Sequence, residues 1–279
     1  TNRGFDSLVG MGDKLVTGTM THNPQHGEPA LYVWSFESGK LLKKVDLEGR
    51  GLTGDLIRVD GSRVAAAYTD ERNRGRVGVF DVEKGAFAWS AAMTINSWNG
   101  ELRLAGERLV LSNNHGVEAF ELESGKALWS NNLSRERRMV MDVTADPMGV
   151  FVLHGDQQTQ LEQTIVRLDA DTGKRAWTYS LPRSTGAFRL AQSQDYLVVP
   201  MMEGRPRENA QNVRMRLSHF QLEKTMLACI DKQAGTRSFV TDVGKLKDMR
   251  YVNIYRPPAL ATVAEDAVYV TMQDSLYVY

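Results

Sequence analysis

Short apolar runs alternate with glycine turns along the whole chain. In each copy an apolar run ends in an acidic or polar residue and passes through a turn. The next run then carries a bulky residue four positions after the turn glycine. Runs of this kind, bounded by Gly, Asp and Asn, predict β-strands joined by tight turns. The five copies are SFESGKLLK (35–43), DVEKGAFAW (81–89), ELESGKALW (121–129), DADTGKRAW (169–177) and DKQAGTRSF (231–239).

The turns repeat at a spacing that is typical of a propeller or a solenoid. Their glycines recur at steps of about 40 to 60 residues, and each copy contains four predicted strands. The first copy places them at 4–10, 14–19, 31–37 and 41–47. The predicted fold class is therefore all-β, with four-stranded antiparallel blades. Five blades are complete, and 259–263, 267–272 and 275–279 supply three strands of a sixth.

The motif resembles the repeat of the pyrroloquinoline quinone (PQQ)-like, or quinoprotein-like, β-propellers. The best copies are DADTGKRAW and ELESGKALW, whereas Lys43 and Phe239 replace the tryptophan in the first and fifth. The resemblance implies one propeller domain over residues 1–279, similar to bacterial envelope propellers such as the outer-membrane assembly lipoprotein. Because the sixth blade lacks its outer strand, we expect a piece of a longer chain that forms a seven- or eight-bladed propeller.

The repeated residues have a structural interpretation. The turn glycine supplies the positive φ of a tight hairpin, and the aromatic ring four positions later can wedge between neighbouring blades. We therefore expect Trp89, Trp129 and Trp177 to be packing residues. Lys40, Lys126 and Lys174 are expected to be solvated turn residues.

The long connections are all expected at one rim. In an antiparallel blade, the second-to-third connections lie at the same end as the links between blades. The longest, Glu203–Lys224, is basic and is the predicted partner-binding insertion. Its candidate residues are Arg205, Arg207, Arg214 and Arg216. Val213, Leu217 and Phe220 have the spacing of a short helix, which leaves open that the insertion merely covers apolar surface of the rim.

A second set of arginines is associated with the innermost strands. Guanidinium groups that converge in a central channel would bind carboxylate or phosphate groups in a bidentate manner. Strand side chains alternate in direction, so packing into blade interfaces is the alternative. The candidate channel residues are Arg58, Arg103, Arg189 and Arg256.

Composition excludes several classes of function. The 34 basic and 34 acidic residues balance, so no nucleic-acid partner is expected. No apolar run has the length of a transmembrane segment. The single cysteine, Cys229, lies in an apolar run and predicts a buried thiol. The sequence contains no recognisable catalytic or metal-binding motif, so no catalytic residue, metal or cofactor is expected.

These features favour a non-catalytic binding or scaffolding module that presents its loop-bearing rim to a protein partner or ligand. One alternative is a fragment of a PQQ-dependent dehydrogenase. For that class the resemblance implies a quinone stacked on a tryptophan, calcium held by carboxylates and often a pair of adjacent cysteines, which this sequence lacks. The other alternative is a sensor propeller attached to a signalling protein. The resemblance favours a periplasmic or cell-envelope location.

Overall fold

The computed structural model describes most of the chain and divides it into two compact units. The described residues are 7–19, 29–49, 51–95, 100–158, 162–183, 185–206, 220–246, 259–265, 267–272 and 275–279. The first unit comprises Thr1–Asn132 with Asp171–Gly173, and the second comprises Leu133–Ala170 with Lys174–Tyr279.

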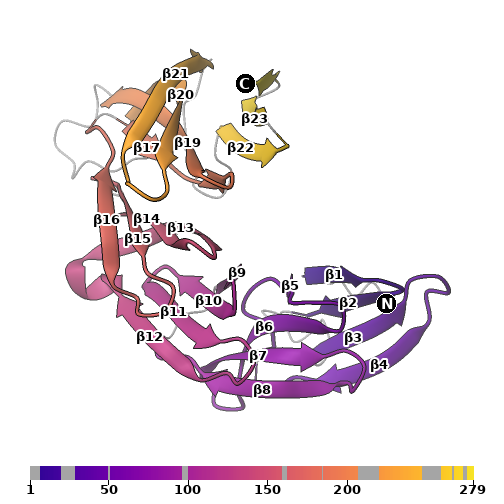
Figure 1. Cartoon of the computed structure of the whole chain (residues 1–279). Helices are drawn as coiled ribbons and strands as arrows, with labels where there is room; N and C mark the ends of the chain where they lie inside the picture. The colour runs from indigo at the N-terminus through magenta and orange to yellow at the C-terminus, as the bar shows by residue number, and fades with distance from the viewer. Residues whose placement is uncertain are drawn as a thin grey trace. The chain divides into compact units, whose positions relative to one another are not determined.

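The first unit contains three antiparallel four-stranded sheets, drawn in indigo to magenta in Figure 1. In each sheet, hydrogen-bonded neighbours follow one another along the chain, as expected of a blade. The sheets are β1 (Ser7–Met11), β2 (Lys14–Gly18), β3 (Ala30–Ser35) and β4 (Leu41–Asp46); β5 (Ile57–Arg58), β6 (Arg63–Thr69), β7 (Gly75–Asp81) and β8 (Ala86–Ala92); and β9 (Glu101–Ala105), β10 (Arg108–Asn113), β11 (Gly116–Glu121) and β12 (Ala127–Asn132).

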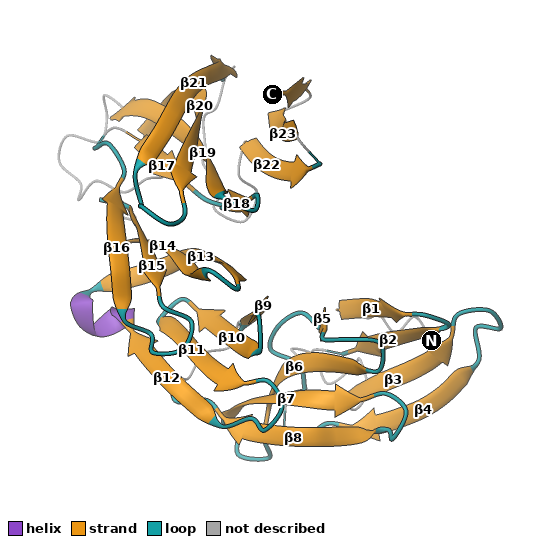
Figure 2. Ribbon diagram, viewed as in Figure 1, coloured by secondary structure: helices purple, strands orange, loops and turns teal. Residues whose placement is uncertain are grey.

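The second unit begins with a short 3-10 helix, η2 (Leu133–Glu136), the only helix drawn in Figure 2, and continues with three more sheets. The last of these has three strands among the described residues. The sheets are β13 (Arg138–Asp146), β14 (Gly149–Asp156), β15 (Thr164–Leu168) and β16 (Arg175–Ser180); β17 (Thr185–Ala187), β18 (Ala191–Gln192), β19 (Tyr196–Pro206), β20 (Phe220–Asp231) and β21 (Arg237–Lys245); and β22 (Ala259–Ala264), β23 (Ala267–Met272) and β24 (Ser275–Val278).

The predicted strand pattern is confirmed in each sheet, with one correction in the longest hairpin. β19 and β20 pair from Tyr196 with Asp231 up to Pro206 with Phe220. The two described ends of the predicted insertion Glu203–Lys224, 203–206 and 220–224, are therefore strand, and Phe220 belongs to β20 rather than to a helix. The backbone ladder continues the sheet because the two antiparallel strands exchange N–H···O=C hydrogen bonds along their paired length. Val213 and Leu217 lie outside the described residues.

The apolar core lies between successive sheets of each unit. In the first unit, Val16, Leu31 and Phe80 are fully buried in a cluster formed by the first two sheets. A second cluster, which includes Leu109 and Phe120, joins the second sheet to the third. Strand side chains point alternately to the two faces of a sheet, so the middle strands β6 and β7 contribute to both clusters.

The repeat tryptophans wedge between sheets as predicted. The ring of Trp89 lies against Gly125, where an added Cβ would come within 2.3 Å of the ring. Its Nε1 donates a hydrogen bond of 2.8 Å to the carbonyl oxygen of Leu122. Trp177 packs against Gly235 in the same way. Glycine at the turn is thus required both by its positive φ and by the ring that covers it.

Lys43 takes the tryptophan's place in the first repeat. Its aliphatic stem lies against Gly85, and its Nζ donates to the carbonyl oxygens of Val82, at 3.3 Å, and Glu83. A long lysine side chain can cover apolar surface with its methylene groups while its ammonium group donates hydrogen bonds. The wedge is therefore a position in the fold that either a tryptophan or a lysine can fill.

Ion pairs reinforce the contacts between neighbouring sheets. In the three sheets of the first unit, a basic residue at the start of the second strand reaches the acidic residue two positions before the next turn glycine. Exposed pairs of this kind each contribute about 0 to 1 kcal/mol, so they add little to the stability of the fold. The pairs are Lys14 with Glu83, Arg63 with Glu123, and Arg108 with Asp171.

Candidate binding surface at the loop-bearing ends of the sheets

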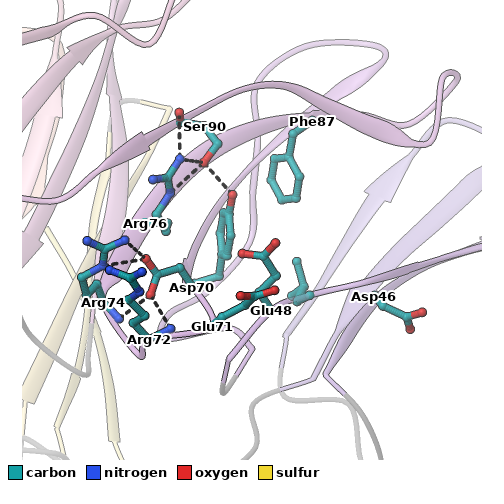
Figure 3. A pocket seen from close by; sticks show the side chains of 11 residues that line it. Asp46, Glu48, Asp70, Glu71, Arg72, Arg74, Arg76, Phe87 and Ser90 are labelled. Carbon is teal, nitrogen blue, oxygen red and sulfur yellow. Dashed lines mark hydrogen bonds and ion pairs between the residues drawn. The ribbon is translucent and has the colours of Figure 1, made fainter.

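Within each sheet the second-to-third connection lies at the same end as the link to the next sheet. This follows from the antiparallel order of the strands. In the first unit, two such segments come together: the β6–β7 loop, 70–74, and the start of the link after β4, 47–49. Between them lies a cavity of about 610 Å³. Figure 3 shows its lining residues.

Asp70 holds the β6–β7 loop in one conformation. Its Oδ1 accepts hydrogen bonds of 2.9 Å from the backbone N–H groups of Arg72 and Arg74, and its Oδ2 accepts one of 2.8 Å from the Arg74 Nε. Hydrogen bonding to the Arg74 backbone, supported by the Arg74 guanidinium, lowers the pKa of Asp70. Asn73 takes a positive φ in the same loop. The charged side chains of the loop are thus carried on an ordered backbone.

Gly49 allows the link after β4 to approach this loop. Its φ is +63°, and an added Cβ would lie 2.1 Å from the carbonyl oxygen of Asp70. No other residue type can occupy such a position without moving the backbone. The neighbouring Glu48 and Glu71 are therefore both brought to the cavity, although they come from different sheets.

Aromatic rings form the apolar part of the lining. The rings of Tyr68 and Phe87 stack with their centroids 4.9 Å apart. The Tyr68 hydroxyl donates a hydrogen bond of 2.7 Å to the Ser90 Oγ. The Arg76 Nε and NH2 also donate to that oxygen, at 3.0 and 2.8 Å. Arg76 is thereby bound to the outer strand β8. The Tyr68 hydrogen bond to the same serine fixes the orientation of the aromatic pair.

The remaining charges differ in whether they are already paired. Asp46 forms an ion pair of 2.5 Å with Lys44, and Asp70 pairs with Arg74. Glu48 and Glu71 are exposed, and their carboxylates make no ion pair or hydrogen bond with the residues that the structure describes. In the view of Figure 3, the carboxylates of Asp46, Glu48 and Glu71 lie on the opposite side from the three labelled arginines.

Of the arginines predicted for partner binding, Arg205 has a described backbone position. Arg205 is in β19, opposite Gln221, and its side chain lies outside the described part of the structure. Arg207, Arg214 and Arg216 are also outside the described residues. At the described base of the hairpin, the Lys224 Nζ pairs with the Glu203 Oε2 at 3.0 Å and with the Asp242 Oδ1 at 3.6 Å. These three charges therefore satisfy one another across adjacent strands.

Three of the four predicted channel arginines are described, and each has a local partner. Their convergence on a channel stays a prediction, and Arg256 lies outside the described residues. Arg58 donates to the Asp60 carbonyl oxygen at 3.1 Å, Arg103 pairs with Glu101 at 3.1 Å, and Arg189 pairs with the buried Asp142 at 3.0 Å.

The cavity was not predicted from the sequence. The stretch that contains Asp70 and Glu71 reads as an ordinary polar loop, and nothing in the repeat marks Glu48. The available signal was a glycine, Gly49, directly after an acidic residue in a link between blades. A glycine there indicates a close approach of two backbone segments, but it does not say which segments meet.

The described residues include no group of three or more His, Cys, Asp or Glu side chains placed to hold a metal ion. Cys229 is buried, and burial raises the pKa of its thiol. Trp98, the one tryptophan outside the repeats besides Trp34, is not among the described residues. A helix of the length and hydropathy that crossing a bilayer requires is absent from the described part of the chain.

Comparison with solved structures identifies the fold class as a β-propeller. BamB from Moraxella catarrhalis aligns with all of this chain and 82% of its own, at a TM-score of 0.53 and 12% identity. The Pan2 WD40 domain of Neurospora crassa aligns at a TM-score of 0.57 and 12% identity, over 98% of this chain and 74% of its own. Hydrazine synthase of Kuenenia stuttgartiensis aligns at 0.57 and 12%, over 97% and 74%. At this identity the likeness concerns the fold alone.

The family follows from the sequence. The model of a family described as outer membrane protein assembly factor BamB matches residues 3–161, more than half of the chain. The protein therefore belongs to this family of PQQ-like β-propellers, which confirms the resemblance seen in the repeats. No protein of curated function matches the sequence.

Proposed function

We propose that this protein is a non-catalytic scaffold that binds a protein partner through the loop-bearing ends of its sheets, in the cell envelope. Membership of a family described as an assembly factor carries the proposal. The geometry supports it, because a cavity lined by described residues of the first unit lies at that end. Loops carried by a rigid sheet scaffold are common binding elements.

The opposite ends of the sheets are dominated by packing. The third-to-fourth turns there are short, and wedge residues of the preceding sheet cover Gly85, Gly125, Gly173 and Gly235, whereas Gly39 is open. Their acidic residues pair with the start of a neighbouring second strand. A partner at these turns would compete with contacts that hold the sheets together, whereas the loop-bearing ends leave charged side chains unpaired.

The experiment compares matched substitutions at the two ends. Arg207→Ser/Arg214→Ser/Arg216→Ser removes three charges from the β19–β20 hairpin, and Lys40→Ser/Lys126→Ser/Lys174→Ser removes three from the turns. Each variant is expressed in the source cells, cross-linked, and purified with whatever it contacts. We expect the hairpin variant to lose a cross-linked partner that the turn variant retains. Loss in the turn variant alone would refute the assignment of the binding end.

The dehydrogenase alternative is tested by reconstitution. Purified protein is titrated with PQQ and Ca²⁺, followed by quinone absorbance and by reduction of an artificial electron acceptor with alcohols and sugars. We expect no saturable change in absorbance and no turnover. Stoichiometric quinone binding with turnover would replace the scaffold proposal with an enzymatic one.

A further inference from the structure

The cavity between β4 and the β6–β7 loop has the chemistry of a receptor for a cationic side chain. We infer that it receives an arginine or lysine side chain from an extended segment of the partner. This inference rests on the proposed scaffold function and specifies what one part of the binding surface recognises.

Charge is the first argument. Of the charged groups that line the cavity, Asp70 is neutralised by Arg74, Asp46 has Lys44, and Arg76 is committed to Ser90. The carboxylates of Glu48 and Glu71 have no partner in the described structure. The guanidinium of Arg72 is the one cationic group of the lining that likewise has no partner there. The lining groups that have no partner therefore carry a net negative charge. Two carboxylates brought together without a counter-ion attract a cation more strongly than either does alone.

The aromatic pair is the second argument. Tyr68 and Phe87 lie in the same lining, and their stacked rings are held in place by the Tyr68 hydroxyl bond to Ser90. A guanidinium or ammonium group over such a ring gains about 0.5 to 2 kcal/mol, depending on how far it is desolvated. The methylene groups of Arg or Lys would meanwhile cover the apolar ring surface. Carboxylates alone would suit any cation, but aromatic rings beside them favour an organic one.

Size and construction are the third argument. A volume of about 610 Å³ exceeds what one metal ion or water cluster needs and is that of a small-ligand site. It can hold a long side chain and part of its backbone. The walls have a defined conformation. Asp70 accepts hydrogen bonds from the backbone of the β6–β7 loop, and Gly49 allows the link after β4 to approach that loop closely. Glu48 and Glu71 thus meet at a position that neither sheet could form alone.

The test uses a defined probe. A fluorescently labelled, acetylated and amidated peptide with three arginines spaced by Gly-Ser is titrated with the full chain, and binding is followed by anisotropy at about 0.15 M salt, where long-range attraction is screened. Its counterpart carries glutamate in place of arginine. We expect the arginine peptide to bind and Glu48→Gln/Glu71→Gln to weaken it at least about tenfold, equivalent to about 1.4 kcal/mol.

A matched variant controls for net charge. Asp55→Asn/Glu107→Gln removes two exposed carboxylates of the same unit that do not line the cavity, and we expect its affinity to stay within about twofold, a change below about 0.5 kcal/mol. Equal weakening in both double variants would reduce the effect to general electrostatics and overturn the inference. The inference would also be overturned if the wild-type chain did not bind the arginine peptide. A preference of the wild-type chain for the glutamate peptide would overturn it too and would indicate that Arg72 binds an anion there. Melting temperatures of both variants establish that they are folded.

A reversal variant keeps the inference testable if the neutral one is ambiguous. Glu48→Lys/Glu71→Lys should shift the preference from the arginine to the glutamate peptide, and an unchanged preference would contradict a direct contact. Failure here is distinguishable from failure of the proposed function. If the cross-linked partner persists in Glu48→Gln/Glu71→Gln, the scaffold proposal stands and only the cavity assignment falls; a wild-type chain that captures no partner defeats the scaffold proposal itself.

Discussion

His154 should make this protein less stable as the pH falls from 7 to 5. The side chain lies in β14, is 4% exposed, and neither ring nitrogen has a hydrogen-bond partner among the described residues. Burial, with smaller contributions from the charges of Arg138 and Arg175, lowers its pKa to about 4. The imidazole is therefore neutral in the folded protein at pH 5, whereas in the unfolded chain, with a pKa near 6.5, it is mostly protonated.

The direction and size of the effect follow from this difference. Between pH 6.5 and 4 the unfolded state binds more protons than the folded state, so the free energy of unfolding falls as the pH falls. The full difference corresponds to about 3 kcal/mol, which is reached only below the folded-state pKa. Between pH 7 and pH 5 we expect a loss of about 2 kcal/mol from this residue alone. Carboxylates with lowered pKa values, such as Asp60, affect stability at lower pH than this histidine does.

The assay is urea unfolding at pH 7, 6 and 5 for the wild type and for His154→Leu, which keeps a neutral side chain of similar size. Between pH 7 and pH 5, the free energy of unfolding of the variant is expected to fall by about 2 kcal/mol less than that of the wild type. His154→Gln serves as a second variant if leucine perturbs folding. Parallel pH dependence in the wild type and both variants would refute the burial of a neutral imidazole at this position.

Further perturbations test the packing. Lys232 is 1% exposed and its Nζ donates to Asp146 and to the Ser193 carbonyl oxygen, so Lys232→Met should cost about 3 to 5 kcal/mol in urea unfolding. Adding Asp146→Asn to that variant should recover part of the loss, and two additive losses would argue against a coupled pair. Trp177→Ala should lower the free energy of unfolding by about 3 kcal/mol while a folded sample retains its cross-linked partner; a stable variant that loses only the partner would mark the ring as a binding residue. Arg63→Ala, by contrast, should change the melting temperature little, since its bidentate pair with Glu123 is exposed, and a large drop would show that the inter-sheet pairs stabilise the fold.

The strand order was determined by the sequence itself. Turn glycines such as Gly125 and Gly235 lie between apolar runs and carry the positive φ that the hairpins require, so local chemistry alone places the strands around them. The wedge role of Trp89 and Trp177 could also be predicted, since a large ring at a fixed distance from each turn has few other places to pack. That Lys43 would act in the same way could not be predicted, because its role depends on the carbonyl groups of a neighbouring sheet.

Only the tertiary structure decided where the binding chemistry lies. The helical spacing of Val213, Leu217 and Phe220 suggested a helix, but pairing of β19 with β20 carries Phe220 into a strand, because a long antiparallel ladder outweighs a weak local preference. Glu48, Glu71 and Phe87 are far enough apart in sequence that no pattern connects them; they meet because Gly49 admits the backbone of Asp70. The burial of His154 is likewise invisible in its sequence neighbourhood. Strand patterns report which face of a sheet a residue occupies, whereas contacts between sheets depend on how neighbouring blades pack.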